Sequence, residues 1–270
     1  MAVTIHPTAI VDPKAQLADG VEVGPFAIVE ANTIIGANTK IGHHSFIASG
    51  ARIGKDCTIH HSAVVANVPQ DLKFKGTEET TVEIGDNVTI REFATIHRAT
   101  IHSYKGNAGT KDGVTRIGNN CLIMAYAHVA HDCSIGNNVI LSNGVQVAGH
   151  CTVESFVTVG GLTGLHQFSM IGSYSMVGAV LLVSKDIPPY ALIGDQPPRF
   201  IGINRIGLER RGFTTDVIKK IRDAYKLIYH SGMNVSDALK KIDSDPVFAL
   251  DEIRHIATFI RQSDRGIISK

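Results

Sequence analysis

Residues 117–183 of the chain read IGNNCLIMAYAHVAHDCSIGNNVILSNGVQVAGHCTVESFVTVGGLTGLHQFSMIGSYSMVGAVLLV. An Ile, Leu or Val returns at every sixth position of this stretch, and the same period runs from Ile5 to Val65 and from Ile84 to Ile96. A period of six matches neither the 3.6-residue turn of an α-helix nor the two-residue alternation of an ordinary strand. It is typical of a parallel β-helix built from hexapeptides. The sequence therefore predicts a mainly β protein.

Each hexad is expected to supply one short strand and one corner, so that three hexads close a triangular coil of about 18 residues. The aliphatic residue fills the interior of the coil, and the residue four positions later is nearly always small, as at Ala51, Cys57 and Ala63. Because coils stack at the inter-strand spacing of roughly 4.8 Å, residues about 18 positions apart are predicted to lie above one another wherever no insertion intervenes.

The period breaks at residues 66–83 and 101–116, which we expect to be loops extruded from the solenoid. Repeat scaffolds usually place contacts with ligands or neighbours on such loops. We assign the solenoid to residues 1–190, because the run DIPPYALIGDQPPR contains two Pro-Pro pairs that cannot continue strands or enter helices. Residues 191–270 change to a helical period and are predicted to form a C-terminal helical domain.

Three helices are predicted in the C-terminal domain. Thr214 or Thr215 caps the first helix, and Gly232 lies beyond its end. A short second helix is expected around residues 238–242. The third is expected to begin at Asp245, with proline at its first helical position, and to end at Gly266.

Composition excludes several classes of protein. The chain has 26 Lys and Arg against 25 Asp and Glu, so no overall charge points to nucleic acid. Residues 199–241 hold ten Lys or Arg against four Asp or Glu, which fits a solvated helical face or a docking surface for an acidic partner.

All four cysteines fall on the small position of a hexad, which predicts core residues rather than disulfides or a metal cluster. We find neither a signal-peptide pattern nor an apolar run of roughly 18 residues, and expect a cytoplasmic protein with no membrane span.

The segment AHVAHDC at 127–133 interrupts the solenoid with polar residues. We take Val129, Val147 and Leu165 as equivalent anchors on successive coils. Stacking then gathers a set of polar and glycine residues along one corner, within about 10 Å. The set consists of His131, Asp132, Gly149, His150, His166 and Gln167, with His128 just before the corner.

Histidine can act as a general base near neutral pH, and an adjacent carboxylate raises its basicity and orients it. A glycine N–H one coil away can donate to an oxyanion. No Ser or Cys is placed as a nucleophile, which favours direct attack by a substrate hydroxyl. Two other readings stay open: a metal-dependent hydratase of the carbonic anhydrase kind, with His128, His150 and His166 as ligands, and a purely structural solenoid.

Further motifs accompany the repeat: QDLKFKG, TIHR, MAYAHVAHDC, AGH, GLTGLHQF, DIPPY and GLERRGF. Together they resemble the bacterial UDP-N-acetylglucosamine acyltransferases of lipid A biosynthesis, within the hexapeptide-repeat acyltransferase superfamily, over essentially the whole chain. The resemblance implies a left-handed β-helix and a homotrimer with active sites between subunits. It also implies transfer of an R-3-hydroxyacyl chain from acyl carrier protein to the 3-hydroxyl of UDP-N-acetylglucosamine, without a metal or cofactor. The N-acyltransferase of the same pathway is a rival with the same fold, which we disfavour because the hexads already begin at Ile5.

The resemblance also implies roles for individual residues. By the family motif, His131 is the general base, Asp132 its orienting partner and Gly149 the oxyanion donor. Contacts with the sugar or pantetheine are implied for Asp71, Lys73, His128, His150 and His166, and contacts with the nucleotide for Gln167, Asn204, Arg210 and Arg211. The basic stretch 199–241 suits the acidic carrier protein.

Three expectations bear on specificity. Ile206 stands where the family has Glu, so one nucleotide contact is missing or replaced. Asn204, Arg210 and Arg211 also fit the capped, charged beginning of a helix. The acyl chain is expected to run along the stacked coils above the catalytic corner and to end near Ala179.

Overall fold

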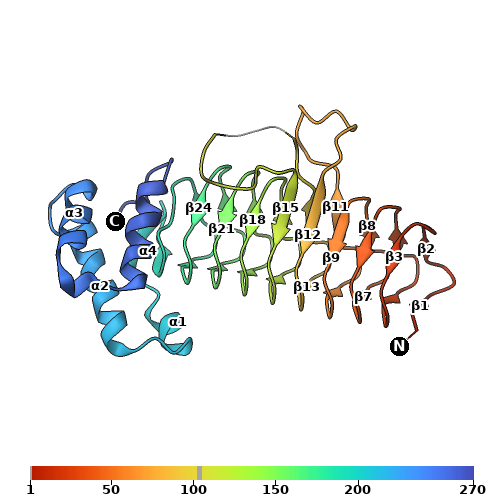
Figure 1. The fold of residues 1–270 in the computed structure, drawn as a ribbon, viewed down its shortest axis with the longest axis horizontal. Coiled ribbons are helices and arrows are strands. Elements are labelled where there is room, and N and C mark those ends of the chain that lie inside the picture. The colour runs from red at the N-terminus through yellow and green to blue at the C-terminus, as the bar shows by residue number, and fades with distance from the viewer. Residues whose placement is uncertain (1, 102–104) are drawn as a thin grey trace.

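The structure is a computed structural model that describes residues 2–101 and 105–270 (Figure 1). The predicted hexads form short strands that stack into three faces of a left-handed parallel β-helix, and helices follow at the C-terminal end. The mainly β architecture predicted from the six-residue period is therefore confirmed.

The three faces each take every third strand of the solenoid. The first face consists of β1 (Thr4–Ile5), β4 (Glu22–Val23), β7 (Lys40–Ile41), β10 (Thr58–Ile59), β13 (Thr89–Ile90), β16 (Leu122–Ile123), β19 (Ile140–Leu141), β22 (Thr158–Val159), β25 (Met176–Val177), β27 (Ala191–Gly194) and β28 (Arg199–Ile203). The second face consists of β2 (Ile10–Val11), β5 (Ile28–Val29), β8 (Phe46–Ile47), β11 (Val64–Asn67), β14 (Thr95–His97), β17 (His128–Val129), β20 (Gln146–Val147), β23 (Gly164–Leu165) and β26 (Leu182–Val183). The third face consists of β3 (Gln16–Leu17), β6 (Ile34–Ile35), β9 (Ala51–Ile53), β12 (Thr81–Ile84), β15 (Val114–Ile117), β18 (Ser134–Ile135), β21 (Thr152–Val153) and β24 (Met170–Ile171).

The hexad anchors set the register between coils. Val129 pairs with Val147, one coil further along the chain, and both are fully buried. Where a loop intervenes, the anchors still pair across it: Ile59 pairs with Ile90, and Ile90 with Ile123. The inserted residues are therefore extruded without breaking the stack, because each aliphatic anchor keeps its place in the core.

Both loops leave the solenoid at the corner between the second and third faces, and they stand on the same side of the molecule (Figure 1). The first joins β11 to β12 and the second joins β14 to β15. Strand residues extend into the ranges expected for the loops, since β11 continues to Asn67 while β12 and β15 begin at Thr81 and Val114. The residues next to each anchor still pair with the neighbouring coil, which shortens the extruded part.

The first face continues past residue 190. Strand β27 lies between the two Pro-Pro pairs and pairs in parallel with β25, and β28 returns antiparallel to β27. The expectation that this proline-rich run cannot continue strands is wrong for β27, because the prolines flank the strand rather than enter it.

The C-terminal helices are α1 (Arg205–Arg210), α2 (Thr215–His230), α3 (Val235–Ser244), the 3₁₀ turn η1 (Pro246–Phe248) and α4 (Asp251–Gln262). Thr214 caps α2 through the Val217 N–H, as predicted. Asp245 caps only the short turn η1, and α4 ends before Gly266, so the expected bounds of the third helix are corrected. Helix α1 is not among the three helices expected from an apolar period, because it is too short for one, but its cap at Asn204 agrees with the reading of Asn204, Arg210 and Arg211 as a capped, charged beginning of a helix.

All four cysteines are buried and free, as predicted. Within residues 2–101 and 105–270, no helix combines the length and apolarity needed to cross a membrane.

Candidate active site

The corner between the second and third faces, formed by the turns after β17, β20 and β23, is called the His131 corner below. The His150 N–H donates to the His131 carbonyl at 3.0 Å, and the Phe168 N–H donates to the Gly149 carbonyl at 3.1 Å. Residues of successive turns are therefore stacked in the order expected from the 18-residue spacing.

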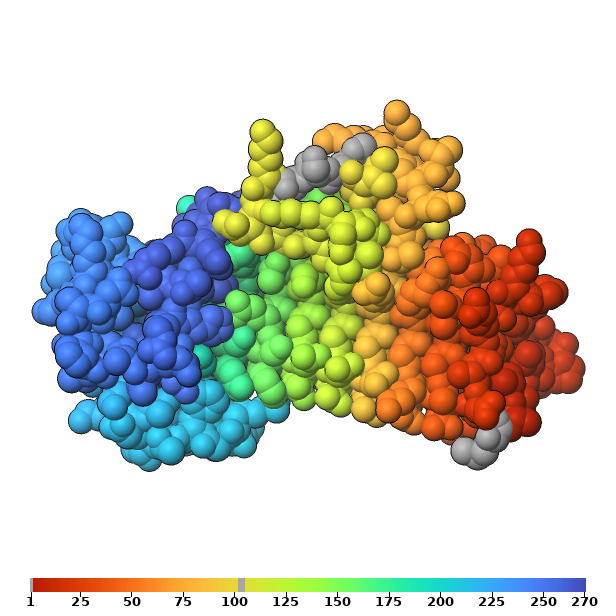
Figure 2. Space-filling model, viewed as in Figure 1, coloured from red at the N-terminus to blue at the C-terminus, as the bar shows by residue number. Residues whose placement is uncertain are grey.

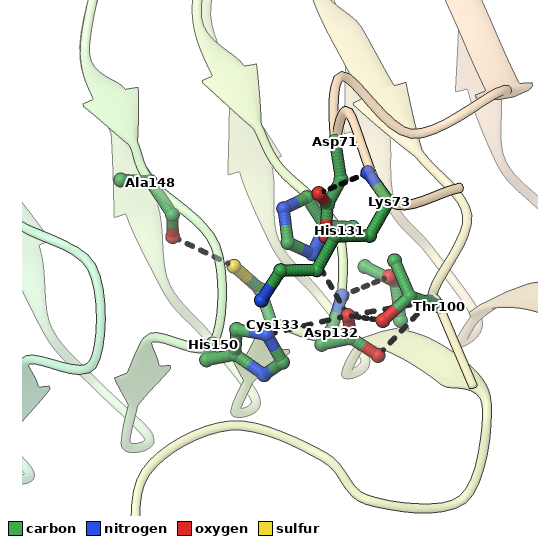
Figure 3. A network of polar contacts seen from close by, with 9 residues as sticks. Asp71, Lys73, Thr100, His131, Asp132, Cys133, Ala148 and His150 are labelled. Carbon is green, nitrogen blue, oxygen red and sulfur yellow. Dashed lines mark hydrogen bonds and ion pairs between the residues drawn. The ribbon is translucent and has the colours of Figure 1, made fainter. Parts of the chain in front are cut away.

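His131 and Asp132 are hydrogen-bonded to each other within one turn (Figure 3). His131 Nδ1 lies 2.8 Å from Asp132 Oδ2, and the Asp132 side chain is only 2 % exposed. An ionised carboxylate can only accept, so Nδ1 carries the proton and Nε2 is left with its lone pair. This arrangement leaves Nε2 of His131 able to accept a proton.

Two threonines at the ends of the second loop hold Asp132. The Thr100 hydroxyl donates to Asp132 Oδ2 at 2.8 Å, and the Thr100 N–H reaches both carboxylate oxygens at 3.1 and 3.2 Å. The Asp132 N–H donates to the Thr115 hydroxyl at 2.9 Å. Sequence reasoning missed both threonines. The inserted loop breaks the 18-residue spacing for Thr100, whereas Thr115 lies 17 positions before Asp132, within the regular spacing, and could have been found from it.

The backbone of Gly149 lies directly against the His131 ring. A Cβ atom at Gly149 would stand 2.6 Å from Cε1 of His131, so only glycine leaves room for the imidazole. The Gly149 N–H donates to no group among residues 2–101 and 105–270, which leaves it available for an oxyanion.

His150 completes the buried part of the corner. Its Nε2 lies 3.6 Å from Asp132 Oδ2, and its ring meets the His131 ring edge-on, with centroids 5.2 Å apart. The His150 ring also stacks on the Phe168 ring, with centroids 4.9 Å apart.

His128 lies on the second face, one coil from His97. Its Nδ1 is 2.7 Å from the Thr95 hydroxyl, and its ring meets the His97 ring edge-on at 4.8 Å. Burial, and next the charge of His131, lower the pKa of His128. Burial, followed by the charges of His128 and His131, lowers the pKa of His97 to about 4. Both rings are therefore neutral near pH 7. His97 belongs to the TIHR motif, but no role of its own is predicted for it from the sequence.

The first loop reaches the same corner. The Lys73 N–H donates to Asp71 Oδ1 at 2.9 Å, and Figure 3 shows the Lys73 side chain running into the cluster formed by His131 and His150. His166 and Gln167 are exposed two coils from His131, and His166 Nδ1 lies 3.0 Å from the Gln167 carbonyl.

Asn204, Arg210 and Arg211 lie away from the His131 corner. Asn204 caps α1, where Oδ1 accepts from the Gly207 N–H at 3.2 Å and Nδ2 donates to the Tyr174 carbonyl at 2.8 Å. The Arg211 guanidinium lies 4.7 Å from the centre of the Phe156 ring. A single chain therefore does not bring these residues to His131.

A groove of about 910 Å³ runs along the first face and is lined by Met176, Leu192, Asn204, Ile206 and Arg210. Ile206 is 63 % exposed beside it. Ala179 follows β25 at the corner between the first and second faces, so the expectation that it lies above the His131 corner is wrong.

Among the described residues, one set of three can place metal-ligand atoms within 4.8 Å of one another: His131, Asp132 and His150. His128 and His166, which the hydratase reading would use, are not part of it. The 2.8 Å between His131 Nδ1 and Asp132 Oδ2 is shorter than the separation of about 3.3 Å expected for two ligands of a tetrahedral zinc ion. A proton fits between these atoms better than a metal.

Two family models match the chain. Residues 32–67 and 115–149 match the bacterial transferase hexapeptide (six repeats), and residues 186–268 match the UDP N-acetylglucosamine O-acyltransferase, domain 2. The acyl-[acyl-carrier-protein]--UDP-N-acetylglucosamine O-acyltransferase of Janthinobacterium sp. (strain Marseille) is 48% identical over 269 residues, which cover 98% of each chain. The enzyme of the same name from Thiobacillus denitrificans is 45% identical over 265 residues, which cover 98% of this chain and 99% of that one.

Solved structures agree in fold over nearly the full length. The UDP-N-acetylglucosamine acyltransferase of Francisella novicida has a TM-score of 0.93 at 36% identity, covering 99% of this chain and 94% of the other. The corresponding enzyme of Bacteroides fragilis has a TM-score of 0.91 at 43% identity, covering 97% and 99%.

Proposed function

Because the chain belongs to the family of UDP-N-acetylglucosamine O-acyltransferases, we propose that it moves an R-3-hydroxyacyl group from acyl carrier protein to the 3-hydroxyl of UDP-N-acetylglucosamine, with His131 as general base. This is the first step of lipid A biosynthesis, and we place it in the cytoplasm. The observation that supports the base is the 2.8 Å contact between His131 Nδ1 and the buried Asp132 carboxylate.

The reaction needs a proton acceptor, because a sugar hydroxyl is too weak an acid to attack a thioester unaided at neutral pH. Nε2 of His131 takes the hydroxyl proton while the sugar oxygen forms a bond to the thioester carbonyl carbon. The carbonyl oxygen becomes an oxyanion that the Gly149 N–H stabilises. Collapse of this intermediate breaks the carbon–sulfur bond, and the imidazolium of His131 returns its proton to the leaving thiolate.

Neighbouring residues bind the two substrates. Lys73, oriented by the turn that Asp71 forms in the first loop, contacts the sugar or the pantetheine together with His150. The neutral ring of His128 and the exposed side chain of His166 extend this binding surface along the coils. Gln167, on the same turn as His166, faces the nucleotide.

The complete site requires a second copy of the chain. Asn204, Arg210 and Arg211 are near the first face, whereas His131 is on the opposite corner. Exposed apolar side chains, such as Leu162 at 69 % and Val180 at 60 %, follow the corner between the first and second faces and would be covered by a neighbour. A homotrimer that brings the arginines of one subunit to His131 of the next supplies both halves, with the guanidinium groups pairing with the diphosphate.

The acyl carrier protein is acidic and docks on the basic stretch 199–241 of the C-terminal domain. The thioester is then delivered to the His131 corner by its flexible pantetheine arm.

The test is His131→Ala, assayed with UDP-N-acetylglucosamine and 3-hydroxyacyl carrier protein. General-base catalysis is typically worth about 10²–10⁴-fold, so kcat should fall by that order while the fold is kept. His43→Ala is the matched control, because His43 is an exposed histidine on a corner turn away from the His131 corner. A His131→Ala enzyme that retains more than about a tenth of the wild-type kcat would remove His131 from this role.

A further inference from the structure

The second extruded loop contacts both the His131 corner and the C-terminal helical domain. Its residues Asn107–Thr110, called the strap below, cross the His131 corner and reach the segment that follows α4. Figure 2 shows this yellow loop lying against the green coils and meeting the dark blue C-terminal residues. The Asn107 N–H donates to Asp264 Oδ2 at 2.7 Å, and Asn107 Nδ2 donates to the Gln262 carbonyl at 2.9 Å.

The strap packs backbone against backbone on the corner. The Thr110 N–H donates to the Asp132 carbonyl at 2.8 Å, and the Gly109 N–H donates to the Thr152 hydroxyl at 2.7 Å. Gly109 has φ of +71°, and a Cβ atom there would stand 2.5 Å from the Asp132 carbonyl oxygen and 2.7 Å from His150 Cα. No side chain fits between the strap and the corner.

An apolar contact ties the same strap to the helical domain. Ala108 is 2 % exposed and packs with Met170 and with Phe259 of α4. Phe168 packs against this cluster and stacks on the His150 ring at 4.9 Å. The helical domain is thus in continuous contact with the ring of His150 and the backbone of Asp132.

We propose that the strap positions Asp132 and His150 for catalysis, and that the C-terminal helical domain holds the strap in place through Asp264 and Phe259. Asn107, Ala108 and Gly109 are then positioning residues. The proposal rests on the proposed role of the His131–Asp132 pair. It gives the helical domain a part in setting the geometry of the base, in addition to substrate binding.

A matched pair of glycine variants tests the strap. Gly109→Ala forces a methyl group into the Asp132 carbonyl and should lift the strap from the corner. Gly113→Ala lies in the same loop with φ of +74°, but its Cβ would meet nothing closer than 3.6 Å. Both variants carry the same backbone strain, so their difference isolates the contact with Asp132. We expect kcat to fall at least about tenfold in Gly109→Ala, with KM little changed, and to stay within about twofold in Gly113→Ala.

The second readout is the tautomer of His131, followed by NMR of isotope-labelled histidine. A displaced Asp132 no longer fixes the proton on Nδ1, so Gly109→Ala should raise the fraction with the proton on Nε2. A fall in kcat without a change of tautomer would overturn the proposal, and so would no change in either. A changed tautomer with full activity would show that the strap positions Asp132, and would contradict the proposed function of the His131–Asp132 pair in catalysis.

The anchor on the helical domain is tested separately, which also covers the case in which Gly109→Ala does not fold. Asp264→Ala removes the acceptor for Asn107 and should lower kcat and change the tautomer in the same direction, by a smaller factor. Asp264→Asn keeps a carbonyl acceptor and should retain activity. Asp251→Ala is the control, since this exposed residue of α4 pairs only with Arg254 among the described residues. Equal behaviour of Asp264→Ala and Asp251→Ala would overturn the role of the helical domain.

Discussion

His131 Nδ1 lies 2.8 Å from Asp132 Oδ2, although the two residues are consecutive in the chain. Consecutive side chains of a strand point to opposite faces, whereas Asp132 has φ of 59° and so departs from the extended backbone. Positive φ recurs at corners along the whole solenoid, for example at Asp56 and His150, so it belongs to the repeat and is not by itself a sign of a site. The corner turn lets one short segment supply both the proposed base and the carboxylate that is hydrogen-bonded to it.

Asp132→Asn should lower kcat by about 10²-fold or more with little effect on KM. The amide keeps the size of the carboxylate, but it can present an N–H to His131 and so favour the tautomer that lacks a free Nε2 lone pair. Steady-state kinetics measures the effect. Asp56→Asn is the control, because Asp56 occupies the same left-handed corner position, with φ of 57°, away from the site. An Asp132→Asn enzyme as active as Asp56→Asn would contradict the orienting role.

Exhaustive chelation should leave the activity intact. His131, Asp132 and His150 are close enough to be considered as metal ligands, but the contact between His131 and Asp132 has the length of a hydrogen bond. The measurement is activity after dialysis against a chelator, together with elemental analysis of the purified protein. Zinc at one per subunit, with activity lost on its removal and restored on its return, would favour the hydratase instead.

The six-residue period predicts the strands of the solenoid and the stacking of its coils, because every aliphatic anchor packs in the interior of its coil in the same way. The spacing of 18 residues placed His131 beneath Gly149 and Asp132 beneath His150, and the contacts between those turns follow it. Stacked coils make sequence distance a measure of spatial distance, which is rare in globular folds.

The same rule fails wherever the chain leaves the coil. Thr100 holds Asp132 across the second loop, and Asn107 reaches Asp264 from 157 positions away. No period relates these positions, since a loop of inserted residues has no fixed rise per residue. The sequence also does not predict that Asn204 lies away from His131. That position depends on which face of the solenoid is extended by the C-terminal segment.

Stability should fall as the pH drops from about 6.5 to about 4, and His97 should account for part of the loss. Burial lowers the pKa of His97 to about 4 from its ordinary value of about 6.5, so in this range the unfolded chain binds a proton that the folded chain does not. Its contribution is fully present above pH 6.5 and lost as the pH falls towards 4. The size is on the order of 3 kcal/mol.

His97→Phe removes this titration and should flatten the dependence of the free energy of unfolding on pH, as measured by denaturant titration at several pH values. His43→Phe, at an exposed histidine, serves as the control. Equal slopes for wild type and His97→Phe between pH 6.5 and 4 would contradict the prediction, because they would mean that His97 has the same pKa in the folded and unfolded chains.

Subunit mixing should restore activity to two inactive variants. His131→Ala removes the base. The double variant Arg210→Ala and Arg211→Ala removes the two proposed phosphate contacts. A hydrogen bond to a charged group is typically worth about 1.5–3 kcal/mol. In a trimer whose sites combine His131 of one subunit with the arginines of the next, random co-assembly at equal amounts leaves about one site in four with both halves intact. Co-expressed and co-purified trimers should therefore show about a quarter of the wild-type kcat per site.

The control for mixing uses His131→Ala with Asp132→Asn, two changes within one turn of the same subunit. His131 and Asp132 of one corner always come from the same chain, and each variant chain lacks one of the two. No mixed trimer therefore contains a corner with both residues intact. Activity should stay at the level of the separate variants. If the mixture of His131→Ala with the arginine variant also stays there, while native mass spectrometry shows mixed trimers, then Arg210 and Arg211 do not serve the His131 site of a neighbouring subunit.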